Sequence, residues 1–344
     1  MGSGAVVVTG AGGFIGGHLV SALVRAGCRR VRAVDRKPVD RWYQVYDGVD
    51  NRVADLSRRE ACAELCRGAE TVYHLAADMG GMGYIETHKA ECMLSVLIDT
   101  HMLLAARDAD IARFFFSSSA CVYNAARQRD PDVPALRESD AYPAEPEDGY
   151  GWEKLFCERM CRHFREDYGL ETRIARYHNV YGPLGTWMGG REKAPAAICR
   201  KVIEAKLSGD LSIEIWGTGA QTRSFTYIDD CVDGTLRIAA SDVAEPLNLG
   251  SSELVSIDQL VTLVEEIAGV ELERVYAPDA PRGVAGRNSD NTRIRERLDW
   301  EPATPLRDGL EKTYKWIHDE YMKRWGGRLG PRVRAPSVRT SGPS

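Results

Sequence analysis

A chain of 344 residues exceeds a typical domain and can bury a large core, either as one large domain or as two closely joined ones. Apolar residues make up 44% and charged residues 28%, which excludes disordered, collagen-like and coiled-coil proteins. The net charge of -5 is uneven, because residues 321–344 carry six basic and no acidic side chains and leave -11 on the remainder. The strong negative charge of residues 1–320 argues against general binding of nucleic acid.

Membrane segments and metal sites find little support in the sequence. No apolar run approaches the roughly 18 residues of a membrane span, and Ala5–Val8 is too short for the core of a signal peptide. Nine irregularly spaced cysteines favour reduced thiols, so we expect a cytoplasmic protein with no membrane partner.

The pairs Cys62/Cys66 and Cys157/Cys161 each stand four apart on predicted helices. Two thiols make a poor metal site, so core packing is favoured and we predict no metal.

The first half of the chain alternates short β-branched runs with longer amphipathic stretches, which is typical of βαβ units. We predict strands over Ala5–Thr9, Val31–Asp35, Thr71–Ala76 and Arg113–Ser117. Apolar residues at helical spacing predict helices over Phe14–Ala26, Ser57–Arg67 and Thr87–Ala109. Further on we expect a helix from Tyr150 to about Tyr168, a strand Thr172–Tyr177 and a Gly- and Pro-rich loop Gly182–Pro195. The predicted fold class is α/β, with a doubly wound parallel (Rossmann) sheet.

The pattern changes in the second half, where helices mix with shorter strands from Ala194 onward. We expect residues 1–178 to form the doubly wound domain and residues 179–325 mainly a smaller mixed α/β lobe, with the chain crossing back between the two. Gly, Pro, Ser and Arg dominate residues 326–344, and large apolar residues are almost absent there. This composition predicts a disordered tail.

The segment Thr9–Gly16 follows the first predicted strand and opens the first predicted helix. Gly10, Gly13 and Gly16 let the chain turn tightly, bring backbone amides close to a pyrophosphate and pack the helix against the strand. Asp35 ends the second predicted strand 19 residues after Gly16, where a carboxylate can bind the ribose hydroxyls of adenosine. The sequence therefore predicts a dinucleotide site, which we assign to Gly10, Gly13, Phe14, Ile15, Gly16, Asp35, Asp55, Leu75, Ala76, Tyr150 and Lys154.

The expected dinucleotide is NAD, because a carboxylate at the position of Asp35 repels the 2′-phosphate of NADP. Arg36 and Lys37 follow at once and could soften that repulsion. Asp55 and Leu56 could bracket the adenine ring, although an Asp at such a place is equally a solvated helix cap.

Three residue types that suit oxidation of an alcohol occur near the middle of the chain. Tyr150 and Lys154 stand four apart, hence on one helical face, where the ammonium can lower the pKa of the phenol. Such a pair is common on protein surfaces, but Ser119, near the end of a predicted strand, adds a hydroxyl for the same substrate oxygen. Together with the glycine pattern, the trio resembles that of the extended short-chain dehydrogenases. We predict Tyr150, Lys154 and Ser119 as catalytic residues.

Further blocks carry a narrower resemblance. They are Ala76–Tyr84 with its Met-Gly-Gly-Met-Gly run, Ser118–Cys121, Arg176–Pro183, Gly189–Ala196, Gln221–Asp229 and Gly286–Asn291. In these blocks the chain resembles the GDP-mannose 3,5-epimerases, within the NAD-dependent epimerase/dehydratase family. The resemblance implies an NAD-dependent isomerase whose partner is a nucleotide sugar, GDP-mannose, and which inverts C3 and C5.

The resemblance also implies a mechanism. Tyr150, assisted by Lys154 and Ser119, takes the proton of the sugar 4-hydroxyl while NAD accepts the C4 hydride. The resulting ketone acidifies the hydrogens at C3 and C5, and Cys121 and Lys193 form the acid/base pair that removes a proton from one face and returns it on the other. Taken without the resemblance, Cys121 would be a small buried apolar residue and Lys193 a solvated lysine.

The substrate site follows from the same resemblance. Its implied residues are Gly81, Met82, Gly83, Asn179, Lys193, Lys201, Gln221, Arg223 and Arg287. Guanidinium groups suit a diphosphate because they bind it in a bidentate fashion, although each arginine could equally be a surface charge. The extended short-chain dehydrogenases also imply a homodimer, here through the helices predicted over Thr87–Ala109 and Tyr150–Tyr168.

Some positions depart from the epimerase pattern. Asn124 and Ala125 stand where Pro-Glu is expected, and Ala285 stands where an arginine is expected. The alternatives are an epimerase acting at C3 or C5 alone, a 4-epimerase or 4,6-dehydratase acting on another nucleotide sugar, and a non-catalytic NAD-binding scaffold. Ala120 and Cys121 occupy the place of the acidic pair of the dehydratases, and the intact Tyr-Lys-Ser trio argues against a scaffold.

Overall fold

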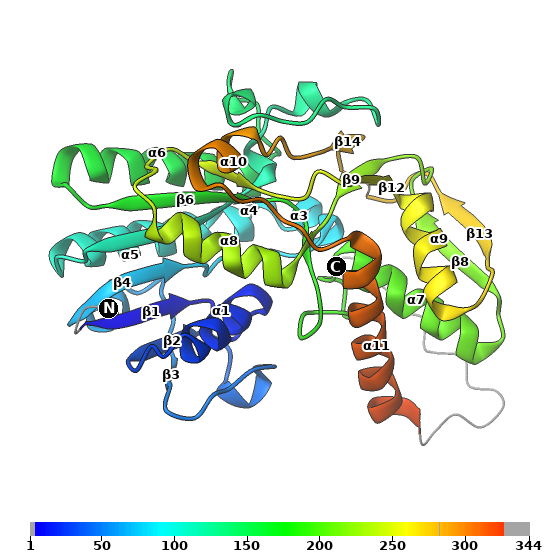
Figure 1. Cartoon of the computed structure of the whole chain (residues 1–344), viewed down its shortest axis with the longest axis horizontal. Coiled ribbons are helices and arrows are strands. Elements are labelled where there is room, and N and C mark those ends of the chain that lie inside the picture. The colour runs from blue at the N-terminus through cyan, green and yellow to red at the C-terminus, as the bar shows by residue number, and fades with distance from the viewer. Residues whose placement is uncertain (1–3, 282, 327–344) are drawn as a thin grey trace.

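The computed structural model describes residues 4–281 and 283–326. A seven-stranded parallel sheet organises them, in the order β11-β6-β5-β4-β1-β2-β3 (Figure 1). Its strands are β1 (Ala5–Thr9), β2 (Val31–Asp35), β3 (Asp50–Val53), β4 (Ala69–His74), β5 (Arg113–Ser119), β6 (Thr172–Tyr177) and β11 (Leu247–Leu249). The order reverses at β1, with β2 and β3 on one side and β4 to β6 on the other. The predicted doubly wound α/β fold is therefore confirmed.

Helices cover both faces of this sheet. On one face α1 (Phe14–Arg25) packs against α8 (Ile228–Ala240). On the other, α5 (Ser95–Asp108) packs between α2 (Arg59–Cys66) and α6 (Tyr150–Tyr168).

Side chains alternate along each strand, so neighbouring residues of β1 enter different cores. Val8 joins the core that contains Leu19 of α1, whereas Val7 joins the core that contains Cys62 of α2. The second core also buries the remaining members of the two cysteine pairs, Cys66, Cys157 and Cys161. Core packing of these pairs is confirmed.

The strand predictions differ from the structure in instructive ways. β1, β2 and β6 have the predicted bounds, β4 begins and ends two residues earlier than predicted, and β5 runs two residues further, to Ser119. β3 was not predicted at all, because its residues Asp50, Asn51 and Arg52 are polar and lie at the sheet edge without an apolar alternation.

The single helix predicted over Thr87–Ala109 is wrong. The segment contains the end of α3 (Met82–Thr87), the short α4 (Lys89–Met93) and α5. The helices are separated at His88 and at Leu94. His88 has a φ of -128° and a ψ of 46°, which are not helical, and its ring stacks on Tyr84 at 4.3 Å between centroids. A local aromatic contact outweighs helix propensity here, which the apolar spacing did not register.

A smaller lobe of helices and short strands lies beside the sheet (Figure 1), with α7 packed against α9 and α11. Its elements are α7 (Ala194–Ser208), β8 (Ser212–Trp216), β9 (Thr222–Ser224), β12 (Leu254–Ser256), α9 (Ile257–Ala268), β13 (Glu273–Ala277), β14 (Gly286–Arg287) and α11 (Leu306–Trp325). Between these elements, α8 and β11 return to the sheet, in keeping with the expected crossing back. The division of the chain at residue 178 remains our proposal, and the predicted tail lies, beyond Gly326, outside the described residues.

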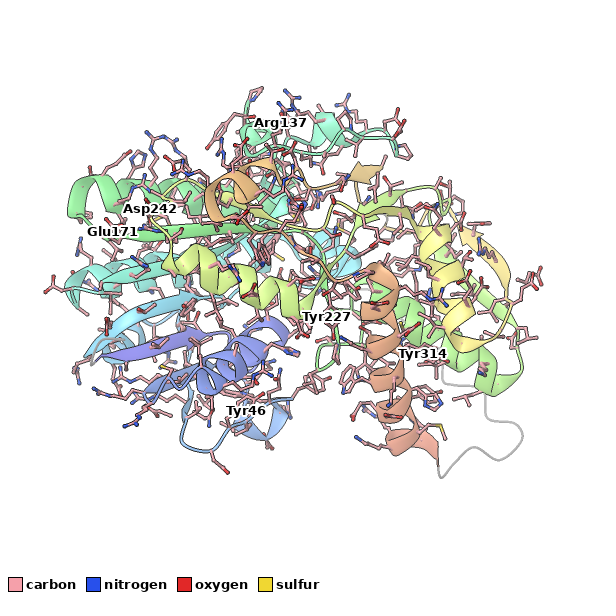
Figure 2. All side chains as sticks on the ribbon, in the orientation of Figure 1. Tyr46, Arg137, Glu171, Tyr227, Asp242 and Tyr314 are labelled. Atoms are coloured by element: carbon pink, nitrogen blue, oxygen red, sulfur yellow. The ribbon has the colours of Figure 1, made fainter. Side chains whose placement is uncertain are left out.

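Short elements connect the two parts. They are β7 (Val180–Tyr181), β10 (Thr226–Tyr227), α10 (Thr292–Leu298) and the one-turn helices η2 (Ala120–Val122), η3 (Ala125–Gln128) and η4 (Glu138–Ala141), whereas the one-turn helix η1 (Val39–Arg41) lies within the sheet domain between β2 and β3. Tyr227, labelled in Figure 2, lies where β10 meets α11, and Lys312 Nζ lies 5.1 Å from the centre of its ring. Among the residues that the structure describes, no helix combines the length and apolarity of a membrane span.

Candidate active site

The glycine-rich turn between β1 and α1 has the geometry that dinucleotide binding requires. Gly10 has a φ of +69°, which favours glycine. A Cβ at Gly13 would lie 2.9 Å from the carbonyl oxygen of Gly10, and a Cβ at Gly16 would overlap that oxygen. The turn therefore tolerates no side chain at these positions, and backbone amides at the start of a helix that follows such a turn can bind a pyrophosphate.

A cavity of about 910 Å³ opens at the carboxyl ends of the strands. Ten of the eleven predicted cofactor residues line it: Gly10, Gly13, Phe14, Ile15, Gly16, Asp35, Asp55, Leu75, Ala76 and Tyr150. The eleventh, Lys154, lies buried next to Tyr150. The loop predicted over Gly182–Pro195 also contributes, through Gly182, Gly185, Thr186, Arg191 and Lys193.

The surroundings of Asp35 suit NAD better than NADP. Lys37 Nζ donates to the carbonyl oxygen of Gly12 at 2.6 Å, and Arg36 pairs with Asp78 at 3.0 Å. Both cations that could have accepted a 2′-phosphate are therefore engaged elsewhere. Asp55 accepts the N–H of Ser57 at 3.0 Å, so it caps a turn and lines the cavity at once.

Tyr150 and Ser119 come together at the floor of the cavity. Burial raises the pKa of Tyr150 above its usual range, while the charge of Lys154 and a contact with the Ser119 hydroxyl lower it. The neighbouring serines point elsewhere, since Ser117 donates to the carbonyl oxygen of His74 and Ser118 donates to Glu158. Of the three consecutive serines, Ser119 is thus the one whose hydroxyl contacts the phenol of Tyr150.

Lys154 is held by buried carboxylates. Its Nζ lies 3.6 Å from Asp99 Oδ2 of α5 and 3.4 Å from Glu153 Oε1, and none of these side chains is more than 1% exposed. Burial alone would lower the pKa of Lys154, but Asp99 and Glu153 raise it above its ordinary value. Burial raises the pKa of Glu153 to about 9, so the pair of carboxyl groups keeps one proton near neutral pH. Asp99 and Glu153 also form, with Cys157, a group of possible metal ligands, and the Lys154 ammonium lies beside both carboxylates.

The network extends to the first strand. His74 Nε2 lies 2.8 Å from Asp99 Oδ1, and His74 Nδ1 lies 2.8 Å from the Thr9 hydroxyl. That hydroxyl accepts the amides of Leu75 and Ala76, both at 3.0 Å. The position of Lys154 is therefore tied to the backbone that borders the cofactor cavity.

Cys121 lies in η2, directly after the strand that carries Ser119, and is 7% exposed. Burial raises the pKa of its thiol to about 12, and Glu147 acts in the same direction whereas Arg287 lowers the pKa. Arg287 Nη1 lies 3.7 Å from Cys121 Sγ. Cys121, Glu147 and Arg287 therefore form a buried charged cluster.

Lys193 directly precedes α7 and lines the cavity, and the charges of the same cluster act on it. Burial lowers the pKa of Lys193, and the nearby charges of Cys121 and Glu147 oppose this effect. A lysine with a lowered pKa can act as a base near neutral pH. The structure thus places Cys121 and Lys193 within electrostatic reach of one another, from segments 72 residues apart in the chain.

The other eight predicted substrate residues do not line the cavity, and five of them form two groups. Three of them surround Trp216: Gly83, where a Cβ would lie 3.3 Å from the ring, Lys201, whose Nζ lies 5.8 Å from the ring centre, and Gln221, which donates to the Trp216 carbonyl oxygen at 2.6 Å. Arg223 and Arg287 form the second group. Burial lowers the pKa of Arg223 to about 10, and the positive charge of Arg287 acts in the same direction.

Three predicted substrate residues hold the surrounding loops in place. Asn179 donates to the carbonyl oxygen of Ser224 at 3.0 Å. A Cβ at Gly81 would overlap the carbonyl oxygen of Glu192, and Met82 Cε would lie 2.9 Å from a Cβ at Gly283. The Met-Gly-Gly-Met-Gly run therefore packs directly on the loop that leads to Lys193.

Sequence analysis missed several residues of this region. They are Glu147, Gln128, Asp99, Glu153 and Asp78. All of these except Glu153 have partners on other segments, as with Asp78, which bonds Arg191 at 2.7 Å. Glu153 could have been noticed, because it adjoins Lys154 in the chain. The other four carry no local signal.

The fold and this cavity define the class of the molecule, an NAD-dependent enzyme of the short-chain dehydrogenase type. The model of the NAD dependent epimerase/dehydratase family matches residues 6–250. The chain belongs to this family.

Individual relatives and solved structures agree with that assignment. The chain is 46% identical to GDP-mannose 3,5-epimerase 1 of Oryza sativa subsp. japonica, over 92% of this chain and 82% of that one. It is also 46% identical to the GDP-mannose 3,5-epimerase of Arabidopsis thaliana, over 92% and 83%. Among solved structures, the UDP-glucuronic acid 4-epimerase from Bacillus cereus, in complex with UDP-glucuronic acid and NAD, has a TM-score of 0.79 and 26% identity and covers 92% of this chain and 100% of that one.

Proposed function

We propose that the chain catalyses the NAD-dependent epimerisation of GDP-mannose at C3 and C5, through a transient 4-keto intermediate. The observation that carries the proposal is the 46% identity, over 92% of this chain, to GDP-mannose 3,5-epimerases, together with a thiol and an amine beside the Tyr-Lys-Ser trio. A simple 4-epimerase needs the trio alone, so Cys121 and Lys193 favour chemistry at the carbons next to the ketone.

The residues divide the chemistry between them. Bound NAD supplies a reversible acceptor for the hydride at C4. Tyr150 takes the proton of the 4-hydroxyl, Ser119 holds the same oxygen, and Lys154 stabilises the phenolate that forms. Once C4 is a ketone, the hydrogens at C3 and C5 become acidic, and Cys121 and Lys193 exchange protons with opposite faces of the sugar. Return of the hydride completes the cycle without net change of the cofactor.

Buried positive charge close to Lys193, which lines the cavity, supports a nucleotide diphosphate as substrate. Arg223 and Arg287 are buried cations on neighbouring strands, β9 and β14, with Lys193 nearby. Guanidinium groups bind phosphate oxygens in a bidentate manner and gain strength where water is excluded. The group around Trp216 offers a second set of contacts, in which Gln221 Oε1 is buried without a hydrogen-bond partner in the described residues.

The proposed setting is a reducing cytoplasm and the proposed assembly a homodimer. All nine cysteines are free, as expected in such a compartment. Trp152 and Phe156 of α6 are 43% and 53% exposed, and Leu97 of α5 is 44% exposed. Apolar side chains exposed along two neighbouring helices support pairing with a second copy.

The test is incubation of the NAD-loaded protein with GDP-mannose in deuterated water, followed by NMR of the sugar. We expect deuterium at C3 and C5 and products inverted at one or both centres. Label at C5 or C3 alone would restrict the activity to that carbon. Inversion at C4 without label would indicate a 4-epimerase, and absence of exchange with NAD bound would exclude GDP-mannose as the substrate.

A further inference from the structure

Glu147 lies beside Cys121, and neither the sequence patterns nor the family resemblance gives it a role. It stands on the loop between η4 and α6, three residues before Tyr150. Its backbone N–H donates to the carbonyl oxygen of Cys121 at 3.0 Å, which fixes the loop against that residue. The carboxylate and the thiol are thereby held as neighbours, and each shifts the pKa of the other.

Arg287 links the two groups. Its Nη2 donates to Glu147 Oε1 at 2.6 Å, its Nη1 lies 3.7 Å from Cys121 Sγ, and its Nε donates to Gln128 Oε1 at 2.6 Å. The side chains of Glu147 and Arg287 are only 10% and 4% exposed. Since the guanidinium has three partners, its position relative to the thiol is determined by the fold.

The second oxygen of Glu147 is unusual. Oε2 is buried and has no hydrogen-bond partner within residues 4–281 and 283–326. A buried carboxylate oxygen without a donor carries an unrecovered desolvation cost, so its retention calls for an explanation. Among the neighbouring groups, the S–H of Cys121 is the donor that explains this oxygen.

We propose that Glu147 is a positioning residue of the proton-transfer step, which keeps the proton of Cys121 on the sulfur and so makes Cys121 the proton donor and Lys193 the proton acceptor. This inference rests on the proposed function. A thiolate next to the carboxylate would place a second negative charge in the same buried space, which is unfavourable where the local dielectric is low.

The charged neighbours of the thiol support this division of roles. Burial and Glu147 raise the pKa of Cys121, whereas burial lowers the pKa of Lys193. The groups that favour the Cys121 thiolate, and so lower the pKa of Cys121, are the cations Arg287 of β14 and Arg223 of β9, together with the hydroxyl of Ser119 at the end of β5. Tyr150 of α6 also faces Cys121. Glu147 is the one carboxylate among the groups named here, so it alone resists loss of the thiol proton by its charge.

The proton balance of the step is as follows. The amine of Lys193 takes the proton from the carbon next to the ketone and becomes an ammonium, while the electron pair of the broken C–H bond moves onto the carbonyl oxygen as an enolate. The pair returns to the carbon, which takes the thiol proton on the opposite face, so that an S–H bond breaks and a C–H bond forms. Arg287 stabilises the thiolate, and a water molecule carries the proton from the ammonium of Lys193, which lines the cavity, back to Sγ.

The test compares the alkylation of Cys121 by iodoacetamide in the NAD-loaded wild type, Glu147→Gln and Arg287→Gln, from pH 7 to pH 10, with mass spectrometry of the Cys121 peptide. Thiolate is the reactive form, so a pKa lowered by about one unit speeds alkylation about tenfold below the midpoint. We expect E147Q to react about tenfold faster than wild type at pH 8. We expect R287Q to react more slowly, because the cation that favours the thiolate is gone.

If the alkylation rate of Cys121 rises in E147Q and falls in R287Q, the cause is the charge of each residue and not a loss of structure. A loosened pocket would speed up both variants, and that outcome, or an E147Q rate equal to wild type at every pH, would overturn the proposal. Glu145→Gln is the matched control, since Glu145 lies on the same loop, is exposed and loses the same charge. The rates are measured without sugar nucleotide, so their outcome is independent of the GDP-mannose test.

Discussion

The Tyr150 side and the Cys121 side of the active site both bury cations next to carboxylates, but they draw on different parts of the chain. Around Lys154 the partners Asp99 and Glu153 stand on α5 and α6, two helices packed on the sheet. Around Arg287 the partners Cys121 and Glu147 stand on a one-turn helix and a loop. The first cluster is part of the core, and the second is assembled where loops from the sheet domain meet β14.

The difference separates the two steps of the proposed reaction. Oxidation at C4 relies on groups held by regular structure, and the same groups also border the cofactor. Proton exchange at C3 and C5 relies on segments whose mutual position depends on the loops. Substitutions on the Tyr150 side are therefore expected to abolish all chemistry, and substitutions on the Cys121 side to affect the proton step alone.

The largest effect is expected for Tyr150→Phe. Without the phenol no group takes the proton of the 4-hydroxyl, so turnover with GDP-mannose should fall by about 10³-fold or more. NMR of product formation measures this loss, and a binding titration should show NAD affinity close to that of wild type. Tyr168→Phe, at the exposed far end of the same helix, serves as the control. Turnover of Y150F within tenfold of wild type would show that another group is the base.

A smaller and more selective effect is expected for Cys121→Ala. Removal of one member of the acid/base pair should slow deuterium exchange at C3 and C5 by about 10²-fold, while oxidation at C4 continues. Reduced cofactor should therefore accumulate on addition of GDP-mannose and be visible by its near-ultraviolet absorbance. Cys28→Ala, a free cysteine outside the cluster, is the control. If C121A lost cofactor reduction together with exchange, the two sides would not be separable.

The effect that is smallest per pH unit concerns stability and involves Glu153→Gln. An unfolded glutamate titrates near about 4.3, and burial raises the pKa of folded Glu153 to about 9. Between these values the folded state binds more protons than the unfolded state, so the free energy of unfolding should fall as the pH rises, by up to about 1.4 kcal/mol per pH unit. E153Q should remove this slope in urea unfolding between pH 5 and pH 9. An unchanged slope, with the exposed Glu60→Gln as control, would assign the pH dependence to other groups.

Local sequence patterns were sufficient to predict the structure wherever residues that are close in the chain also contact one another in the fold. The glycine turn, Asp35 at the end of β2, and Tyr150 with Lys154 all depend on spacings of a few residues or on one βαβ unit, and ten of the eleven predicted cofactor residues line one cavity. The strands β1, β2 and β6 were predicted with their observed bounds for the same reason. Break points such as His88 were missed because a ring contact, rather than spacing, decides them.

By itself, the sequence determined the doubly wound fold, the choice of NAD and the Tyr-Lys-Ser trio, since each follows from short-range geometry and from the chemistry of single side chains. Only the tertiary structure decided which carboxylates accompany Lys154 and Cys121. Asp99 and Lys154 are 55 residues apart and Glu147 and Arg287 are 140 residues apart, and no periodicity links such positions. Burial then decides the protonation of these groups, because the cost of an unpaired charge depends on everything packed around it.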